Sequence, residues 1–382
     1  MMRVEVRPEL LRWARERSGL DIAALGRRFP RLDAWERGET RPTLKQVEGF
    51  AKATHTPVGY LFLQEPPVER MPIPDFRTVA NERVGHPSPD LLDTVYICQQ
   101  RQEWYRNFAR SMGDEPLTFV GSVRVAGDVV RTAARIRRAL GFDLAERRQL
   151  STWTDALRRF IEQADAADVL VMVSGVVGSN NRRKLDPQEF RGFALADELA
   201  PLVFINGADT KAAQMFTLAH ELVHVWIGQS ALSDAQASQV PEHQVERWCN
   251  QVAAEFLVPT DEFRAQFDPS RDRRAQLQPL AEHFRVSTQV ILGRFREAGA
   301  LTWDEYLTEL AVERERAAAI ITARGGGGNY YSTKAVYVSK RFARAMIGSA
   351  LEGQTPYPQA FRLLGLKKAA TFDRLAERLG VM

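Results

Sequence analysis

The chain has 382 residues, of which 45% are hydrophobic, and its 52 basic and 48 acidic residues give a net charge of +4. This length suits two or three domains, and the near balance of charge permits nucleic-acid contact without requiring it. No run of about 18 apolar residues could form a transmembrane helix. Two cysteines are too few for a disulfide framework or a thiolate metal site. The N-terminus has no apolar signal segment, so we expect a cytoplasmic protein with no membrane partner.

Short helices separated by turn signals fill the first 66 residues. Asp21 and Thr43 each precede a helical pattern and can cap it, while Gly19 and Gly38 end others. We therefore predict a first helical domain over residues 1–66. A proline-rich linker and a helical region, with helices over 90–110 and 125–140, should then occupy residues 67–150.

The pattern changes at residue 151, where apolar, β-branched runs alternate with helical ones. Strands are predicted at 169–177, 190–196 and 202–206, and the main helices at 154–164, 212–228, 244–258 and, as a pair, 277–298. The fold class is accordingly α+β and mostly helical, with a core over 151–323. The glycine run that follows Arg324 should link this core to a small C-terminal domain over 324–382.

A metal-binding pentapeptide, HExxH, lies in the predicted helix 212–228. His220 and His224 are four residues apart, which places both imidazoles on one helix face as two ligands of one ion. Glu221 follows the first ligand, so its carboxylate can act on a water without binding the ion itself. Two of only six histidines in the chain lie here. We interpret the motif as a zinc site with Glu221 as general base, although such a site would also accept manganese.

Catalytic zinc normally has three protein ligands, so a third is expected from a nearby element. Glu246 is favoured because Asn250 lies one turn further along the same predicted helix. From there the Asn250 side chain could hydrogen-bond to Glu246 and orient it toward the ion. His243 is the main alternative, and Glu242 and Glu255 are further candidates. Glu255 is nine residues beyond Glu246 and should point elsewhere.

These motifs together resemble the ImmA/IrrE family of metallopeptidases. The resemblance rests on the stretch Phe216–His224, on Glu246 and Asn250 followed by the apolar run that ends at Pro259, and on the strand 202–206. Cys249 stands where the family usually has alanine. The resemblance implies a small gluzincin-like fold with His220, His224 and Glu246 on zinc and Glu221 as general base. It also implies proteolysis of a regulatory protein, often a helix-turn-helix repressor.

Substrate contacts are less sharply indicated. The strand 202–206, with Asn206 at its end, could pair an extended substrate by edge addition. Tyr330, Tyr331 and His283 are candidate oxyanion-stabilising residues, although a structural role fits each of them better.

Two segments are typical of helix-turn-helix units. Residues 20–44 resemble the Xre/Cro type, with Arg31, Arg37 and Arg41 as candidate DNA contacts beside two acidic residues that would repel phosphate. The second unit lies within 277–298, where Ser287 is a predicted helix cap. Specific DNA binding and protein docking are equally compatible with the first unit.

The leading hypothesis is a zinc endopeptidase that cleaves a regulatory protein, such as a repressor or a toxin or antitoxin partner, in a stress, phage or mobile-element response. The alternative is a DNA-binding regulator or antitoxin whose peptidase fold is silent. A purely structural metal site is a third possibility, which the expected open coordination position disfavours.

Overall fold

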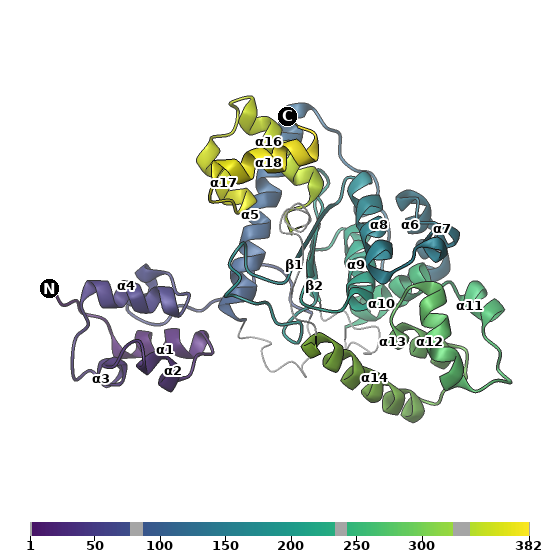
Figure 1. The fold of residues 1–382 in the computed structure, drawn as a ribbon, viewed down its shortest axis with the longest axis horizontal. Coiled ribbons are helices and arrows are strands. Elements are labelled where there is room, and N and C mark those ends of the chain that lie inside the picture. Colours follow the sequence, from purple (N-terminus) through teal and green to yellow (C-terminus); the bar gives the residue numbers. More distant parts are fainter. Residues whose placement is uncertain (1, 77–86, 234–242, 324–336, 382) are drawn as a thin grey trace. The chain divides into compact units, whose positions relative to one another are not determined.

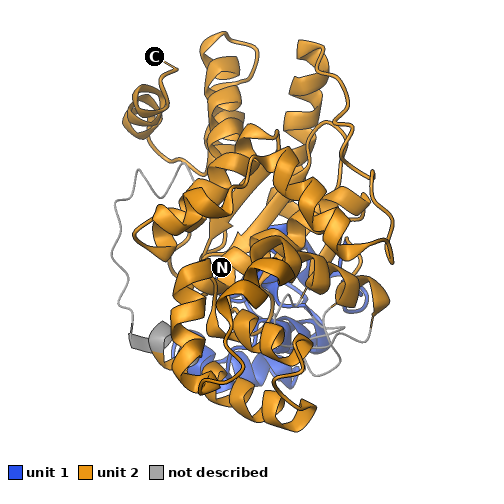
Figure 2. Ribbon diagram, turned by 90° about the vertical axis from the view of Figure 1, so that its right-hand side faces the viewer, with its two compact units in different colours: residues 1–72, 82–95 blue, residues 73–81, 96–382 orange. Residues whose placement is uncertain are grey.

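The computed structural model describes residues 2–76, 87–233, 243–323 and 337–381. The chain divides into two compact units, one formed by residues 1–72 and 82–95 and the other by residues 73–81 and 96–382 (Figure 2). The domain boundaries expected from the sequence stay predictions. The second unit includes the C-terminal helices as well as the sheet.

The first unit is helical, and local capping chemistry explains where two of its helices begin. The side chain of Asp21 accepts a hydrogen bond from the Ala23 amide, and Thr43 forms a capping box with Gln46, as the sequence predicted. Arg15 pairs with the buried Glu36 at 2.8 Å. The elements are α1 (Pro8–Arg17), α2 (Ile22–Gly26), α3 (Leu32–Glu36), α4 (Leu44–Ala53) and the 3-10 helix η1 (Val58–Phe62).

The second unit is built on a four-stranded sheet, as far as the described residues show, in the order β1-β3-β2-β4. β1 and β3 are parallel, whereas β2 runs antiparallel to both β3 and β4. The strands are β1 (Leu170–Ser174), β2 (Gly192–Leu195), β3 (Leu202–Asn206) and β4 (Ala231–Ser233). The sequence predicted the first three but missed β4, which has only three residues.

The position of β3 overturns one expectation. Because β3 lies between β1 and β2, both of its edges are paired and no substrate strand can add to it. The edges of the sheet are β1 and β4. Edge addition at residues 202–206 is therefore wrong.

Helices cover both faces of this sheet (Figure 1). Val171 and Val203 point toward the core shared with α8 (Trp153–Ala166) and α9 (Lys211–Ile227). On the other face, α5 (Pro89–Met112) is tied to the sheet by Gln102, whose amide donates to the carbonyls of Leu195 and Ala200 at 2.9 Å. All four strands are buried, as expected for a sheet covered on both sides.

The remaining helices of the core extend outward from α9 through α10. α10 (Gln244–Leu257) contacts α9 and α6 (Val129–Leu140), and α12 (Arg273–Phe284) and α13 (Thr288–Glu297) form the predicted pair, with Arg285 at φ 50° in the turn. Ser287 is the N-cap residue of α13, as predicted, but its side chain makes no capping hydrogen bond. The other elements are α7 (Leu144–Gln149), α11 (Thr260–Gln266) and α14 (Trp303–Ala323).

Three helices end the chain, α16 (Lys340–Leu351), α17 (Tyr357–Leu364) and α18 (Ala369–Leu379). They dock on the same unit, where Phe342 packs edge-on against Trp104 of α5 and Lys340 pairs with Glu162 of α8 at 2.9 Å. The predicted glycine link after Arg324 lies outside the described residues. In the part of the chain that is described, no helix is both long and apolar enough to cross a bilayer.

Candidate metal centre

The helix α9 carries the HExxH motif through the centre of the unit. Thr210 caps its N-terminus and Gly228, in the left-handed conformation, ends it. His220, Glu221 and His224 are each 0% exposed. The Nε2 atoms of His220 and His224 lie 3.1 Å apart, one helical turn separating the two residues.

Glu246, the first acidic residue of α10, completes a three-residue group. Its Oε2 lies 3.1 Å from Nε2 of His220 and its Oε1 lies 3.0 Å from Nε2 of His224. Ligands held about 2.0–2.1 Å from a tetrahedral zinc ion are about 3.3 Å apart, so these spacings fit one small ion. The structure thus brings together His220, His224 and Glu246, a group that could hold a metal.

Burial and mutual charge set the proton affinities at this group. Burial lowers the pKa of His224, which favours the neutral imidazole that metals bind. Burial alone would raise the pKa of Glu246, but the charges and hydrogen bonds of the two histidines outweigh it and hold that pKa below its ordinary value. Burial and the nearby charge of Glu246 raise the pKa of Glu221 well above its ordinary value. A carboxyl group shifted this way suits proton transfer.

Several buried polar atoms of the site have no hydrogen-bond partner among the described residues. They include Nδ1 of both His220 and His224 and both carboxylate oxygens of Glu221. Buried polar groups are otherwise almost always paired, since leaving one unpaired costs about 1–3 kcal/mol. The free carboxylate of Glu221 is the arrangement expected of a group that acts on a water or a substrate, whereas the Nδ1 atoms lie across each ring from the converging Nε2 atoms and are not part of the ligand set.

Of the other candidates for the third ligand, those that the structure describes do not join the group. His243 is exposed at the N-terminus of α10 and its ring packs 5.3 Å from that of Phe76. Glu255 points away, as the spacing predicted, and pairs with Arg294 at 3.0 Å. Glu242 lies outside the described residues.

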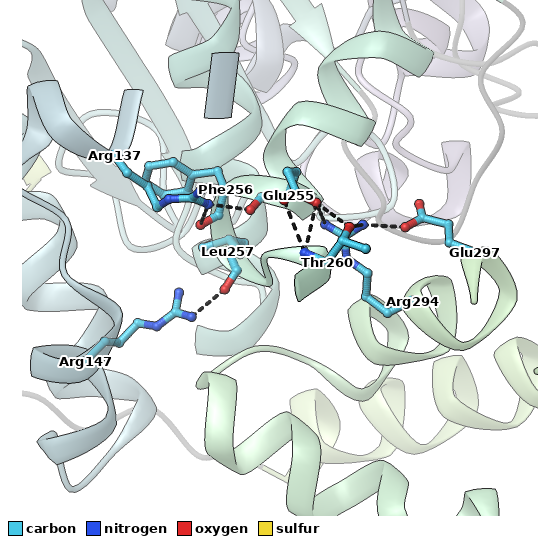
Figure 3. Close-up of polar contacts among 8 residues, drawn as sticks. All are labelled: Arg137, Arg147, Glu255, Phe256, Leu257, Thr260, Arg294 and Glu297. Carbon is cyan, nitrogen blue, oxygen red and sulfur yellow. Dashed lines mark hydrogen bonds and ion pairs between the residues drawn. The ribbon is translucent and has the colours of Figure 1, made fainter. Parts of the chain in front are cut away.

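A polar network at the far end of α10 holds this helix in place (Figure 3). Glu255 accepts hydrogen bonds from the amide and hydroxyl of Thr260 as well as from Arg294. Arg137 of α6 donates to the carbonyl of Glu255 at 2.6 Å, and Arg147 of α7 donates to the carbonyl of Leu257 at the helix end. The carbonyls that end α10 thereby have hydrogen-bond donors from α6 and α7. These contacts anchor the helix that carries Glu246.

Two residues that the sequence did not single out shape the site. Gly192 of β2 permits the close approach of α9, because a Cβ there would lie 2.6 Å from Cγ2 of Thr217 and 3.2 Å from Cγ of Glu221. Ser233 of β4 places its hydroxyl 3.4 Å from Nε2 of His224. A glycine inside an apolar strand is a signal of close approach that could have identified Gly192.

A short segment of the chain pairs with the outer edge of β4 next to the site. The Leu232 amide donates to the carbonyl of Pro74 at 2.9 Å, and the Phe76 amide donates to the carbonyl of Leu232 at 2.9 Å. The bridge between Asp75 and Leu232 is parallel. The ring of Phe76 stacks over that of His224 with centroids 6.4 Å apart.

The remaining predicted site residues lie elsewhere. Asn206 is buried, and its amide group is engaged with the carbonyl of Phe190 and the amide of Ala208, so it is not a substrate-binding residue here. Asn250 makes no hydrogen bond to Glu246, and its Oδ1 has no partner among the described residues, so the orienting contact expected of it is not formed. The electrostatic neighbours of His283 are Arg148 and Glu262 rather than the metal group. Tyr330 and Tyr331 are outside the described residues.

The candidate DNA contacts of the first unit lie on its surface. Arg37 pairs with Asp33 at 2.5 Å and with Glu39 at 2.7 Å, Arg41 lies 3.7 Å from Glu5, and Arg31 is exposed. DNA binding by this unit stays a prediction.

In a comparison with known protein families, two parts of the chain match a family model. Residues 164–296 match the family model Peptidase M78, described as an IrrE N-terminal-like domain, and this region includes His220, Glu221, His224 and Glu246. The match supports the resemblance to ImmA/IrrE proteins and points to a metallopeptidase. Residues 338–378 match a domain of unknown function. No curated protein matches the chain significantly.

Proposed function

We propose that this protein is a zinc-dependent endopeptidase that cleaves a regulatory protein, such as a repressor or a toxin or antitoxin partner. The observation that carries the proposal is the buried carboxylate of Glu221, which has no hydrogen-bond partner among the described residues, beside the converging group of His220, His224 and Glu246. Three protein ligands are the number typical of catalytic zinc, whereas structural zinc usually has four. The matched peptidase family model supports the same reaction class.

His220, His224 and Glu246 would hold the ion, which when bound supplies a Lewis acid that polarises the scissile carbonyl and activates water. Glu221 would take the proton from that water and pass it to the leaving amine, and its raised pKa suits both steps. The apolar residues around α9 exclude bulk water, which strengthens each of these interactions. Manganese remains a possible alternative ion, because the ligand types accept it.

The substrate can be captured with a variant that binds without cleaving. We would express Glu221→Gln and wild-type protein with an affinity tag in the native host and compare the captured proteins and their newly formed termini. A partner that accumulates on Glu221→Gln and is cut only with the wild type supports the proposal. A metal-loaded wild type that generates no Glu221-dependent termini contradicts it.

The first unit would deliver the substrate or recognise a partner. Its helices resemble a helix-turn-helix head, but Arg37 and Arg41 have acidic neighbours, which favours a protein partner over DNA phosphate. A gel shift with the protein's own promoter region tests the alternative of a DNA-binding regulator or antitoxin. Sequence-specific binding together with absent proteolysis would make that alternative the better account.

A further inference from the structure

Arg101 of α5 is a buried cation without a carboxylate partner among the described residues. It is 4% exposed, its Nε donates to the carbonyl of Leu363 at 2.9 Å, and its Nη1 contacts Sδ of Met172 at 3.5 Å. A thioether is a weak acceptor, and within the described residues Nη2 makes no hydrogen bond to the protein. Buried charges are ordinarily paired, so this guanidinium needs an anion.

Arg101 opens onto a cavity of about 650 Å³ that is separate from the metal centre. The lining comes from α5, from the loop at residues 178–182 and from the end of α17 with the residues that follow it, 361–367. Three further cations line it, Arg182, Arg362 and Lys367, and none of the lining residues is acidic. Arg362 also borders a neighbouring hollow that contains Glu103, so we assign the phosphate contacts to Arg101, Arg182 and Lys367.

The lining also has an apolar part, formed by Ile97, Phe361 and Leu366. A volume of about 300–1,000 Å³ with a few convergent polar groups is typical of small-molecule sites and exceeds what a phosphate ion needs. Planar guanidinium groups match phosphate oxygens in paired hydrogen bonds, and an aromatic ring offers a stacking surface for a base.

We propose that this cavity binds a nucleoside phosphate, with the phosphates at Arg101, Arg182 and Lys367 and the base toward Phe361. The ligand would contact both the region that matches the peptidase family and the C-terminal domain of unknown function. Ligand binding would thereby fasten the C-terminal helices to the peptidase core and stabilise the folded chain by mass action.

Calorimetric titration of the full-length protein with AMP, ADP, ATP, pyrophosphate and inorganic phosphate tests this. We expect a nucleotide to bind in the micromolar range, more tightly than pyrophosphate or phosphate, and to raise the melting temperature. The double variant Arg182→Ala, Lys367→Ala should weaken binding at least tenfold while keeping the unliganded melting temperature, because both residues are exposed. Lys368→Ala is the matched control, since Lys368 is an exposed neighbour that does not line the cavity.

Each other outcome overturns the proposal. Equal affinity for phosphate and nucleotide would show a general anion site. Absence of binding by all five ligands at millimolar concentration, or equal binding by the double variant and Lys368→Ala, would exclude the cavity as a nucleotide site.

A second inference comes from the segment Pro74–Phe76 and rests on the proposed function. β4 is the sheet edge nearest the metal group, because Ser233 contacts His224. Extended peptides bind such edges through backbone hydrogen bonds. In this structure Pro74 and Phe76 already make those bonds to Leu232, and Phe76 covers His224.

We infer that Pro74–Phe76 is an internal inhibitory segment that an extended substrate must displace from β4. Phe76→Pro removes both the ring and the amide donor and should speed deuterium exchange at the Leu232 amide. Val68→Ala, at an exposed position of the same linker, is the control. In a Glu221→Gln background, Phe76→Pro should bind fluorescein-labelled casein, an unstructured probe, several-fold more tightly than Val68→Ala does.

The binding measurement separates this inference from the peptidase proposal. Tighter casein binding by Phe76→Pro supports the inhibitory segment even if no variant with an intact Glu221 cuts casein. Faster exchange at Leu232 with unchanged casein binding overturns it, and so does unchanged exchange, whatever the peptidase activity proves to be.

Discussion

Two buried polar clusters lie on the same helix, α10, and they differ in how far the protein satisfies them. At the C-terminal end, Glu255 has a guanidinium, an amide and a hydroxyl as partners (Figure 3). At the N-terminal end, Glu246 faces two histidines whose Nδ1 atoms are unpaired, beside Glu221 with two unpaired oxygens, as far as the described residues show. The Glu255 carboxylate is fully paired within the protein, although Nε of Arg294 beside it has no partner among the described residues, whereas the Glu221 carboxylate has no partner there at all.

This difference in hydrogen bonding distinguishes a structural cluster from a candidate functional one. The residue types of the two clusters do not distinguish them. Each contains one glutamate of α10 and cations or histidines from a second element, and both are buried. Closing a cluster within the protein lowers the cost of burial. Leaving it open accepts that cost so that an ion and a substrate can bind. The predictions below test each side of this comparison.

Removing the histidines should have the largest effect. We expect about one equivalent of zinc or manganese on the purified wild type and none on His220→Ala, His224→Ala, because three protein ligands are needed to hold the ion. Elemental analysis checks this. His243→Ala should retain the metal, since His243 lies outside the group; loss of metal there would mean that the third ligand has been misassigned.

Glu221→Gln should lower the cleavage rate by about 10²–10⁴-fold while keeping the metal, because it removes the proton acceptor but no ligand. The rate is to be measured on the captured partner with metal content determined on the same sample. A metal-loaded Glu221→Gln that cleaves as fast as wild type would place the base elsewhere.

On the structural side, Arg294→Met should destabilise the fold by about 3–5 kcal/mol, because it leaves the buried charge of Glu255 unpaired. Denaturant unfolding measures the change. The folded fraction should still bind one equivalent of metal, since Arg294 is remote from the ligand group. Selective loss of metal with unchanged stability would mean that the two ends of α10 are not independent.

Gly192→Ala should cost about 1–3 kcal/mol, because the added methyl overlaps Thr217 and the Phe204 carbonyl and pushes on Glu221. Gly59→Ala is the control, as a Cβ there meets nothing within 4 Å. Comparable unfolding midpoints for the two variants would show that α9 can move away from β2 without penalty.

The mildest test is acid titration of metal binding. Both histidines must be neutral to bind, and burial lowers the pKa of His224, so this residue stays neutral to a more acidic pH than an ordinary histidine. We expect the metal affinity to be constant near neutral pH and to fall as the pH drops below the ordinary histidine range. Affinity that rises on acidification would contradict histidine ligation.

Local spacing was enough to predict much of the site. The spacing of four positions from His220 to His224 places both on one helix face, and the run from Glu246 to Pro259 marks a second amphipathic helix, so local patterns indicated both helices of the site. Caps such as Asp21 and Thr43 were also readable, because capping depends on contacts three residues apart or fewer.

Only the tertiary structure decided which strand lies at an edge and what covers it. β4 has three residues and β3 is enclosed, and neither fact follows from the apolar patterns of the strands, because pairing order depends on contacts distant in sequence. Phe76 stacks on His224, which is 148 positions away in the sequence, and Arg101 donates to the carbonyl of Leu363, which is 262 positions away. The sequence determined the chemistry of the candidate metal group, whereas long-range packing placed the segment Pro74–Phe76 beside it and formed the basic cavity.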